Sequence, residues 1–439
     1  MKIIHLDIFY SFVNLFFRLV TGPLTMLLIS IYLNPEEQGY WYLFGGITAF
    51  SVLADLGFTN IILQFSAHEY VKFREINNII EGSESDLITY GLLLKFVINW
   101  TLRALIFLYP LIFLVGVYYL HRDDKVLEYI IPWIIYSLGT VLAFIANVFI
   151  SFIEGMNKIS FVQKQRLISS IISLVLTVLL LLLNQTLYAL AIGMIISSCY
   201  LLLIILYKNY KTLIKLIAFS KGGVYDWYGA FIPLFRRYAI SFASGFFILQ
   251  MFIPLSHFYY GSIIAGKIGI TLALINSIFQ ISNIWIYTIN PKINSLIAKR
   301  RFIKLDELFD KRMVYAILSY LILFVVFLSF FRIKSDVLML SNLLKRFLDL
   351  QSIIFLFLAY FFQLLVNSWA TYIRGFKIEP FVLPSFILSL YIISIFLFVG
   401  NYFDYKYLFI GFLSSYLWWL PVARYIFLKH KKIEQSRFI

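Results

Sequence analysis

Three ionisable residues, Arg18, Asp55 and Arg103, interrupt long apolar stretches of this sequence. Each is followed or flanked by too little apolar chain to form a complete membrane span without it, so none can reach an interface easily. A charge facing lipid in the middle of a span costs about 2.5–3.5 kcal/mol on insertion scales. We therefore expect these side chains to face protein or a water-filled cavity.

Guanidinium groups bind phosphate oxygens through paired hydrogen bonds, so Arg18 and Arg103 point to an anionic guest. Asp55 has two readings, which the sequence leaves open. It either forms an ion pair with Arg18 or takes part in proton or sodium coupling, as intramembrane carboxylates often do. The sequence contains four further cations near the ends of spans: Lys95, Arg236, Arg237 and Lys267. Each is equally compatible with a place at the edge of the membrane and with a place in the cavity.

Polar residues recur at helical spacing on either side of these charges. Asn14 and Arg18 share one stripe, and Lys95, Asn99 and Arg103 share another. Uncharged stripes follow in later segments, at Asn276, Gln280 and Asn283 and at Gln363, Asn367 and Thr371. For these the sequence allows either hydrogen bonds between helices or a cavity lining. For the stripes that contain arginine it favours the cavity.

The elements that carry these residues are predicted to be membrane helices. Of the 439 residues, 62% are apolar and only 13% charged, against about 25% charged in soluble domains. A span needs roughly 20 apolar residues. The chain is therefore predicted to be an all-α polytopic membrane protein of about twelve transmembrane helices in two six-helix bundles around a central cavity. The predicted spans are 8–33, 40–65, 89–119, 129–153, 161–183, 186–207, 231–255, 262–290, 313–331, 352–373, 381–400 and 405–428.

Basic residues concentrate in alternate loops, with seven between residues 291 and 312. This asymmetry predicts that both termini are cytoplasmic, and it explains the net charge of +15 without nucleic acid as a partner. We expect an N-terminal bundle over 1–207, a cytoplasmic amphipathic linker over 208–230, a C-terminal bundle over 231–428 and a cytoplasmic tail over 429–439. Glu69 and Glu154 are expected to end spans in solvent.

Enzymatic signatures are absent from the sequence. It contains no HExxH, no phosphate-binding P-loop and no Cys/His cluster, and its single cysteine is Cys199. We expect no enzyme activity, no cofactor and no metal, and any uphill transport would use a proton or sodium gradient.

The run from Asn34 to Tyr42 (NPEEQGYWY), with Asp55-Leu56-Gly57-Phe58 and the run from Gln64 to Glu69 (QFSAHE), resembles bacterial O-antigen or polysaccharide-unit flippases. These belong to the multidrug/oligosaccharidyl-lipid/polysaccharide exporter superfamily. The resemblance implies alternating access in the bacterial cytoplasmic (inner) membrane. The implied substrate is an undecaprenyl-pyrophosphate-linked oligosaccharide, moved from the inner to the outer leaflet. Membrane lipids, a polysaccharide polymerase and a chain-length regulator are the implied partners.

In such flippases, cations in the cavity are thought to hold the pyrophosphate. Arg18 and Arg103 match that role best here, ahead of Lys95, Arg237 and Lys267. Expected cavity-lining or coupling positions are Asp55, Asn14, Asn99, Gln280, Gln363 and Asn367. Two alternatives stay open: a multidrug exporter of the same superfamily, and a membrane polysaccharide polymerase or ligase. The first predicts buried carboxylates, and the second a large outer loop with catalytic side chains.

Overall fold

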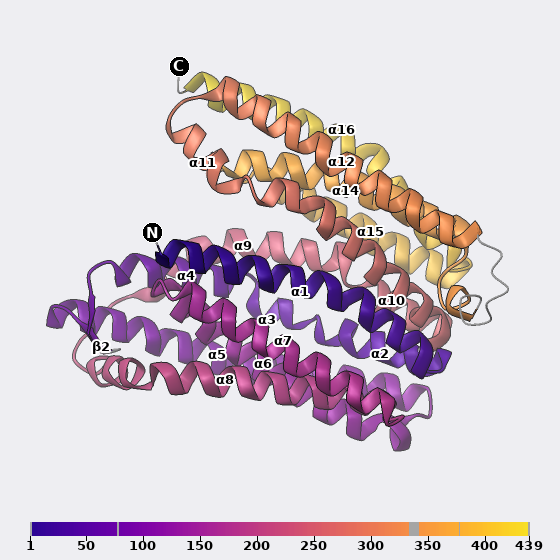
Figure 1. Ribbon diagram of the computed structural model, residues 1–439, viewed down its shortest axis with the longest axis horizontal. Helices are drawn as coiled ribbons and strands as arrows, with labels where there is room; N and C mark the ends of the chain where they lie inside the picture. The colour runs from indigo at the N-terminus through magenta and orange to yellow at the C-terminus, as the bar shows by residue number, and fades with distance from the viewer. Residues whose placement is uncertain (1, 77–78, 333–341, 377, 438–439) are drawn as a thin grey trace. The chain divides into compact units, whose positions relative to one another are not determined.

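The computed structural model describes residues 2–76, 79–332, 342–376 and 378–437, and of some of these, including Arg18 and Arg237, only the backbone. The chain is helical almost throughout (Figure 1). Ten of the twelve predicted spans coincide with a single helix, the second with a broken series of helices, and the span 231–255 crosses the break between α9 and α10. The helices are α1 (Lys2–Tyr32), α2 (Pro35–Thr48), α3 (Ser51–Asp55), α4 (Phe58–Tyr70), α5 (Glu84–Arg122), α6 (Val126–Gly155), α7 (Ile159–Leu182), α8 (Thr186–Phe219), α9 (Trp227–Leu249), α10 (Phe252–Tyr287), α11 (Asn290–Ala298), α12 (Phe302–Arg332), α14 (Leu350–Arg374), α15 (Val382–Tyr402) and α16 (Lys406–Arg437).

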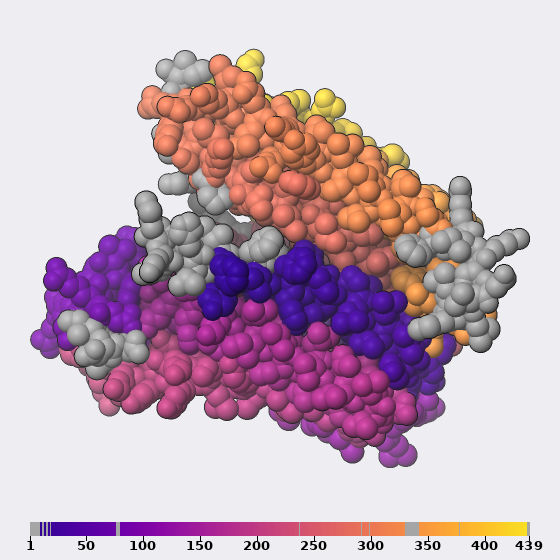
Figure 2. All heavy atoms as spheres, viewed as in Figure 1, coloured from indigo at the N-terminus to yellow at the C-terminus, as the bar shows by residue number. Residues whose placement is uncertain are grey.

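The lengths and surfaces of these helices define a polytopic membrane protein. Among the described residues, eight helical stretches are long and apolar enough to cross a membrane, and the bent pair Pro35–Asp55 and Phe58–Tyr70 would add a ninth. Only 11% of the most apolar window of α12 is buried, and 22% of that of α7. Figure 2 shows the open surfaces of α7 in magenta and α12 in orange. Apolar surface on this scale requires lipid around it.

The chain divides into two compact units. Unit 1 comprises Met1–Thr21 and Leu43–Phe246, and unit 2 comprises Gly22–Tyr42 and Phe247–Ile439. These limits differ from the expected bundles, because most of α9 packs in unit 1 and the end of α1 with the start of α2 packs in unit 2. In unit 1, Phe231 of α9 is buried between Phe58 and Trp100, with ring centres 5.5 and 4.8 Å away. Aromatic packing of this kind accounts for the assignment of α9.

In unit 1, α6 packs against α8, α4 and α5. The turn between α7 and α8 is tight, with Asn184 in a left-handed conformation, and the two helices pack as an antiparallel pair. The predicted hairpin of two spans over 161–207 is therefore confirmed. However, residues 208–219 continue α8 without a break, so they do not form a separate linker helix.

A two-stranded antiparallel ribbon, β1 (Arg74–Ile76) and β2 (Ile79–Glu81), was not predicted. It is held at one end of unit 1 by polar contacts. The carboxylate of Glu75 lies 2.7 Å from Lys158 Nζ, and Lys215 Nζ donates to the Ile80 carbonyl over 2.8 Å. The chain between α4 and α5 is thereby fixed to α7 and α8.

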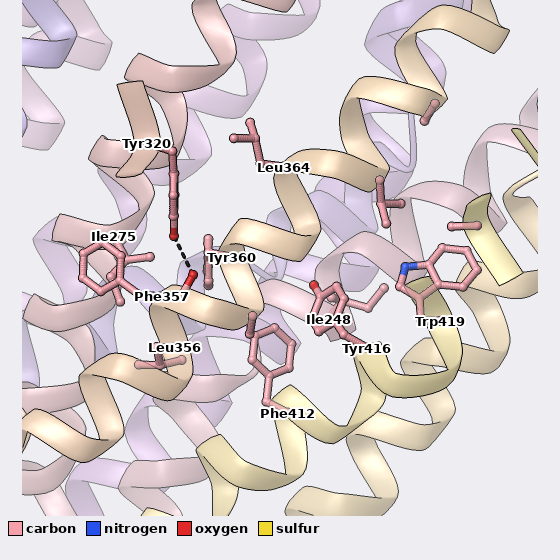
Figure 3. Packing of buried hydrophobic residues seen from close by; sticks show 14 of the residues in the cluster. Ile248, Ile275, Tyr320, Leu356, Phe357, Tyr360, Leu364, Phe412, Tyr416 and Trp419 are labelled. Atoms are coloured by element: carbon pink, nitrogen blue, oxygen red, sulfur yellow. Dashed lines mark hydrogen bonds between the residues drawn. The ribbon is translucent and has the colours of Figure 1, made fainter. Parts of the chain in front are cut away.

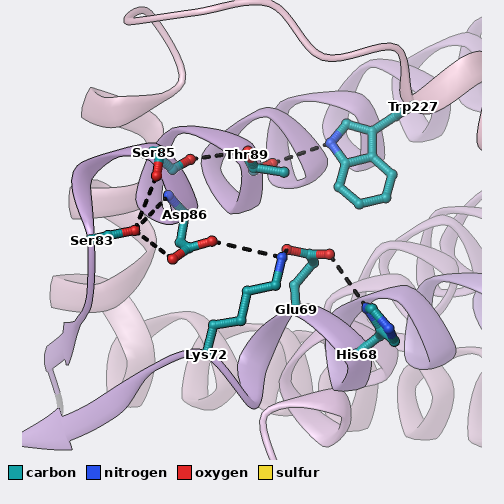
Figure 4. Close-up of polar contacts among 8 residues, drawn as sticks. All are labelled: His68, Glu69, Lys72, Ser83, Ser85, Asp86, Thr89 and Trp227. Atoms are coloured by element: carbon teal, nitrogen blue, oxygen red, sulfur yellow. Dashed lines mark hydrogen bonds and ion pairs between the residues drawn. The ribbon is translucent and has the colours of Figure 1, made fainter.

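The expectation that Glu69 is solvated is wrong. Glu69 is only 7% exposed and forms an ion pair with Lys72 at 2.7 Å, which raises the pKa of Lys72 (Figure 4). Lys72 also lies 3.7 Å from Asp86 near the start of α5. Lys72 thus links the carboxylate of Glu69 at the end of α4 to Asp86 of α5.

The core of unit 2 packs aromatic rings among isoleucine and leucine side chains (Figure 3). The Tyr320 hydroxyl donates to the Phe357 carbonyl over 2.8 Å, and the Tyr416 hydroxyl donates to Gln363 Oε1 over 2.8 Å. These bonds satisfy the polar ends of rings that are otherwise buried among α10, α12, α14 and α16. In α10, Gly261 has φ 82° and ψ 176°, a conformation almost restricted to glycine, and it breaks the helix just before Lys267.

Candidate functional site

Asp55 ends α3, and its side chain caps the next helix. Leu56 and Gly57 both have positive φ, which bends the chain by 44° between the two halves of this span. The carboxylate accepts hydrogen bonds from the backbone N–H groups of Gly57 (3.2 Å) and Thr59 (3.0 Å) and from the Thr59 hydroxyl (3.1 Å). The N-terminus of α4 thus stabilises a negative charge within the span.

A cavity of about 440 Å³ opens beside Asp55 within unit 1. Its polar lining consists mainly of hydroxyl and amide groups from Thr48, Ser51, Thr59, Tyr109, Tyr136, Thr140, Asn147 and Ser151, together with the charged side chains Asp55 and Arg166. The cavity therefore offers hydrogen-bond donors and acceptors and charges of both signs. Such a lining suits water, an ion or a small polar group.

Arg166 and Glu154 connect this cavity to α1. Arg166 Nη2 lies 3.9 Å from Glu154, whose other oxygen accepts from Gln163 Nε2 over 3.3 Å. Gln163 Oε1 in turn accepts from Asn14 Nδ2 over 3.0 Å. The prediction that Glu154 is solvated is wrong, because this carboxylate is a partly buried acceptor between α6 and α7. Asn14 lies in a polar contact between helices.

The predicted stripe on α5 is present as one exposed face. Lys95, Asn99 and Arg103 are all exposed on it. Arg103 Nη1 donates to the Tyr228 hydroxyl over 2.6 Å, and the guanidinium carbon lies 5.6 Å from the centre of that ring. Tyr228 thus orients the arginine, and among the described residues no other hydrogen bond from its guanidinium is present.

A second cavity, of about 820 Å³, lies within unit 2 where α1 ends and α2 begins. Lys267 of α10 and the neighbouring pair Lys345 and Arg346 contribute its charges. Leu27, Ile31, Ile263 and Leu343 contribute much of its apolar wall. This cavity combines three cations with apolar surface.

The remaining predicted positions have varied surroundings. Gln363 accepts from Tyr416, Asn367 is half-buried on α14, and Gln280 is exposed on α10. The side chains of Arg18 and Arg237 lie outside the described residues, and with them the Arg18–Asp55 ion pair. Because the predicted residues are divided between the two units, their grouping around one cavity stays a prediction.

Three charged residues of the cavities were not predicted from the sequence: Arg166, Lys345 and Arg346. Arg166 follows Lys164 near the start of a span, so it reads as an edge cation. Lys345 and Arg346 carried a usable signal. They form a basic pair in a loop that the charge asymmetry assigns to the cation-poor side of the membrane, which calls for a specific role.

No protein-family model matches the chain, and no curated protein matches it either. Two solved structures are similar to it over nearly their whole length. One is the inward-facing conformation of a multidrug resistance MATE family transporter of the MOP superfamily, with a TM-score of 0.53, 14% identity, and coverage of 95% of this chain and 96% of that one. The other is a ligand complex of the MATE multidrug transporter DinF-BH, with a TM-score of 0.56, 14% identity, and coverage of 97% and 95%.

At this level of identity the likeness establishes the fold. The chain has the fold of these two MATE transporters. Both structural neighbours are transporters.

Proposed function

We propose that this protein is a membrane transporter that exports an organic substrate by alternating access. The observation that carries the proposal is the similarity of nearly the whole chain to two transporters of one fold. The apolar exterior and the division into two helical units support it, since rocking of one bundle against another is a common transport mechanism.

Multidrug export is the cargo class that the structural neighbours favour, since both are named as multidrug transporters. Asp55 and Glu154, in and beside the cavity of unit 1, are the described carboxylates that could attract a cationic drug. The test is efflux of the cationic dye ethidium from cells that express the protein, compared with an empty-vector strain. Efflux that requires the protein and collapses with the ion gradient supports drug export.

Flipping of an undecaprenyl-pyrophosphate-linked oligosaccharide is the second candidate. The cations Lys267, Lys345 and Arg346 in unit 2 and the exposed Arg103 in unit 1 favour it, because they suit an anionic cargo. This proposal includes the inner membrane as location, cytoplasmic termini, Asp55 as a coupling group for protons or sodium, and a polymerase and a chain-length regulator as partners. It retains Arg18, Lys95 and Arg237 as candidate pyrophosphate ligands.

One genetic experiment separates the two candidates. In a strain that lacks the protein, a flippase defect leaves single lipid-linked repeat units on the inner leaflet and removes surface polysaccharide. A multidrug-export defect leaves surface polysaccharide intact and increases drug susceptibility. Leaflet-specific labelling of the lipid-linked sugar, run beside a drug-susceptibility panel, distinguishes these outcomes. Accumulation of single units on the outer leaflet would instead indicate a polymerase.

A further inference from the structure

The cavity of unit 2 contains positive charge that the described protein does not neutralise. In the part of the chain that the structure describes, no carboxylate forms an ion pair with Lys267, Lys345 or Arg346. Burial lowers the pKa of Arg346, and the negative charge of Glu37 offsets this effect in part without forming an ion pair. Lys267 and Arg346 are half-buried, whereas Lys345 is exposed. Half-buried cations without a carboxylate partner are unfavourable, and an anion entering the cavity would reduce this penalty.

Arg346 is fixed in position while part of its donor capacity is unused. Its Nη2 donates to the Leu33 carbonyl at the end of α1 over 2.6 Å. Its Nη1 is buried, and no hydrogen-bond partner is present for it among the described residues. The guanidinium is therefore oriented by the protein with a donor left for a ligand. Phosphate oxygens match such a donor well.

Gln38 supplies a fixed acceptor in the same cavity. Its side chain is 1% exposed, and its Nε2 donates to the carbonyl of Gly266 over 2.9 Å and to that of Arg346 over 3.4 Å. Gln38 lines the cavity, and its buried Oε1 has no hydrogen-bond partner among the described residues. A buried acceptor of this kind is costly unless a ligand donates to it, for example through a hydroxyl group.

The apolar part of the lining determines what else the ligand must contain. Leu27 and Ile31 on α1 face the cavity together with Ile263 on α10 and Leu343. The volume of about 820 Å³ is within the range of small-molecule sites. An inorganic anion would leave this apolar surface uncovered, whereas a molecule with a hydrocarbon chain would cover it.

From these observations we propose that the cavity of unit 2 binds the phosphate headgroup of an amphiphilic lipid. Lys267, Lys345 and Arg346 contact the phosphate, and Gln38 Oε1 accepts from a headgroup hydroxyl. The apolar wall contacts the first part of the lipid chain. For the flippase candidate this inference rests on the proposed function and deepens it. For the multidrug candidate it goes beyond the proposed function, since it requires only a membrane around the protein.

The test uses purified full-length protein in detergent and measures binding of four probes: phosphatidylglycerol, zwitterionic phosphatidylcholine, undecaprenyl pyrophosphate and inorganic phosphate. We expect phosphatidylglycerol or undecaprenyl pyrophosphate to bind at least about tenfold more tightly than phosphatidylcholine. Lys267→Gln and Lys345→Gln should each weaken this binding about fivefold, because each removes one cation that faces the headgroup. Lys406→Gln is the matched control, since it removes an exposed lysine of unit 2 outside the cavity and should change nothing.

Three results would overturn the proposal. The first is equal affinity for the anionic and zwitterionic lipids, and the second is unchanged affinity in the folded Lys267→Gln/Lys345→Gln double variant. Inorganic phosphate that binds as tightly as the lipids would also contradict it, because the apolar wall would then have no role. The thermal unfolding midpoint of each variant shows that the protein remains folded.

The four probes also distinguish the source of the lipid. Preference for undecaprenyl pyrophosphate identifies the headgroup of a transported lipid-linked sugar, and comparable binding of phosphatidylglycerol identifies a resident membrane lipid. Either result supports a headgroup site. A protein that binds lipid here but transports neither cargo would contradict the proposed function and leave this inference intact.

Discussion

At the scale of single residues, Asp55 combines a structural role with a candidate role in coupling. Asp55→Ala removes the acceptor for the Thr59 N–H and should lower the free energy of unfolding by about 1–2 kcal/mol. Asp55→Asn keeps a side-chain oxygen that can cap α4, so its stability should stay close to that of the wild type. The thermal unfolding midpoints of both purified variants provide the measurement.

Transport by the same Asp55 variants then separates structure from coupling. If the carboxylate carries a proton or binds sodium, the stable Asp55→Asn variant loses gradient-driven transport. If Asp55→Asn is stable and transports normally, Asp55 acts only as a helix cap and has no role in coupling. An Asp55→Asn variant as unstable as Asp55→Ala would contradict the cap itself.

Arg103 allows a second test at this scale. Arg103→Gln removes the charge on the exposed face of α5 and should reduce transport of an anionic cargo at least about tenfold, because a charge-assisted hydrogen bond contributes about 1.5–3 kcal/mol. Tyr228→Phe is the matched control, since it removes only the hydroxyl that accepts from Arg103. It should retain most transport. Normal export of lipid-linked sugar by Arg103→Gln would remove Arg103 from the binding site.

At the scale of elements, the crossing of α2 and α10 depends on Gly39. A Cβ at this position would lie 2.2 Å from the Ser262 carbonyl oxygen, which belongs to the backbone and cannot move aside easily. Gly39→Ala should therefore lower the free energy of unfolding by at least about 1–3 kcal/mol. Gly45→Ala on the same helix has no atom within 4 Å of the added Cβ, so it should be neutral or stabilising. Unfolding midpoints that fall equally in both variants would argue against the close crossing.

The ribbon β1–β2 makes a second prediction about elements. Glu75→Gln leaves Lys158 without its carboxylate, and both side chains are about four-fifths buried, so we expect a loss of about 1–3 kcal/mol. The reversed pair Glu75→Lys/Lys158→Glu should recover part of it. Glu128→Gln, which removes the exposed pair with Lys125, should change stability by less than about 1 kcal/mol. Limited proteolysis between α4 and α5 reports on this segment directly, and a Glu75→Gln variant as resistant as the wild type would contradict the role of the pair.

At the scale of the whole molecule, the positions of the helices were predictable and their partners were not. Runs of about 20 apolar residues locate the spans, because only a helix satisfies the backbone in lipid. The sequence contains no comparable signal that residues 22–42 join unit 2, since that depends on the contact of Gln38 with Gly266. Burial of Glu69 and Glu154 likewise depends on ion pairs with Lys72, three residues away, and with Arg166 on the next helix, and the sequence pattern reveals neither pair.

The orientation of the whole chain leads to the last prediction. The hairpin of α7 and α8 places Gln185 in an exposed turn at one end of α8, and Lys221 is exposed just beyond the other end. The positive-inside pattern puts Gln185 outside and Lys221 in the cytoplasm. In a Cys199→Ala background, a membrane-impermeant maleimide should label Gln185→Cys in intact cells. It should label Lys221→Cys only after permeabilisation, because α8 is long enough to separate the two positions by a bilayer. Labelling of both positions in intact cells would contradict the prediction that α8 spans the membrane. The reverse labelling pattern would invert the predicted orientation of the chain and place the phosphate-binding cavity of unit 2 on the cytoplasmic side.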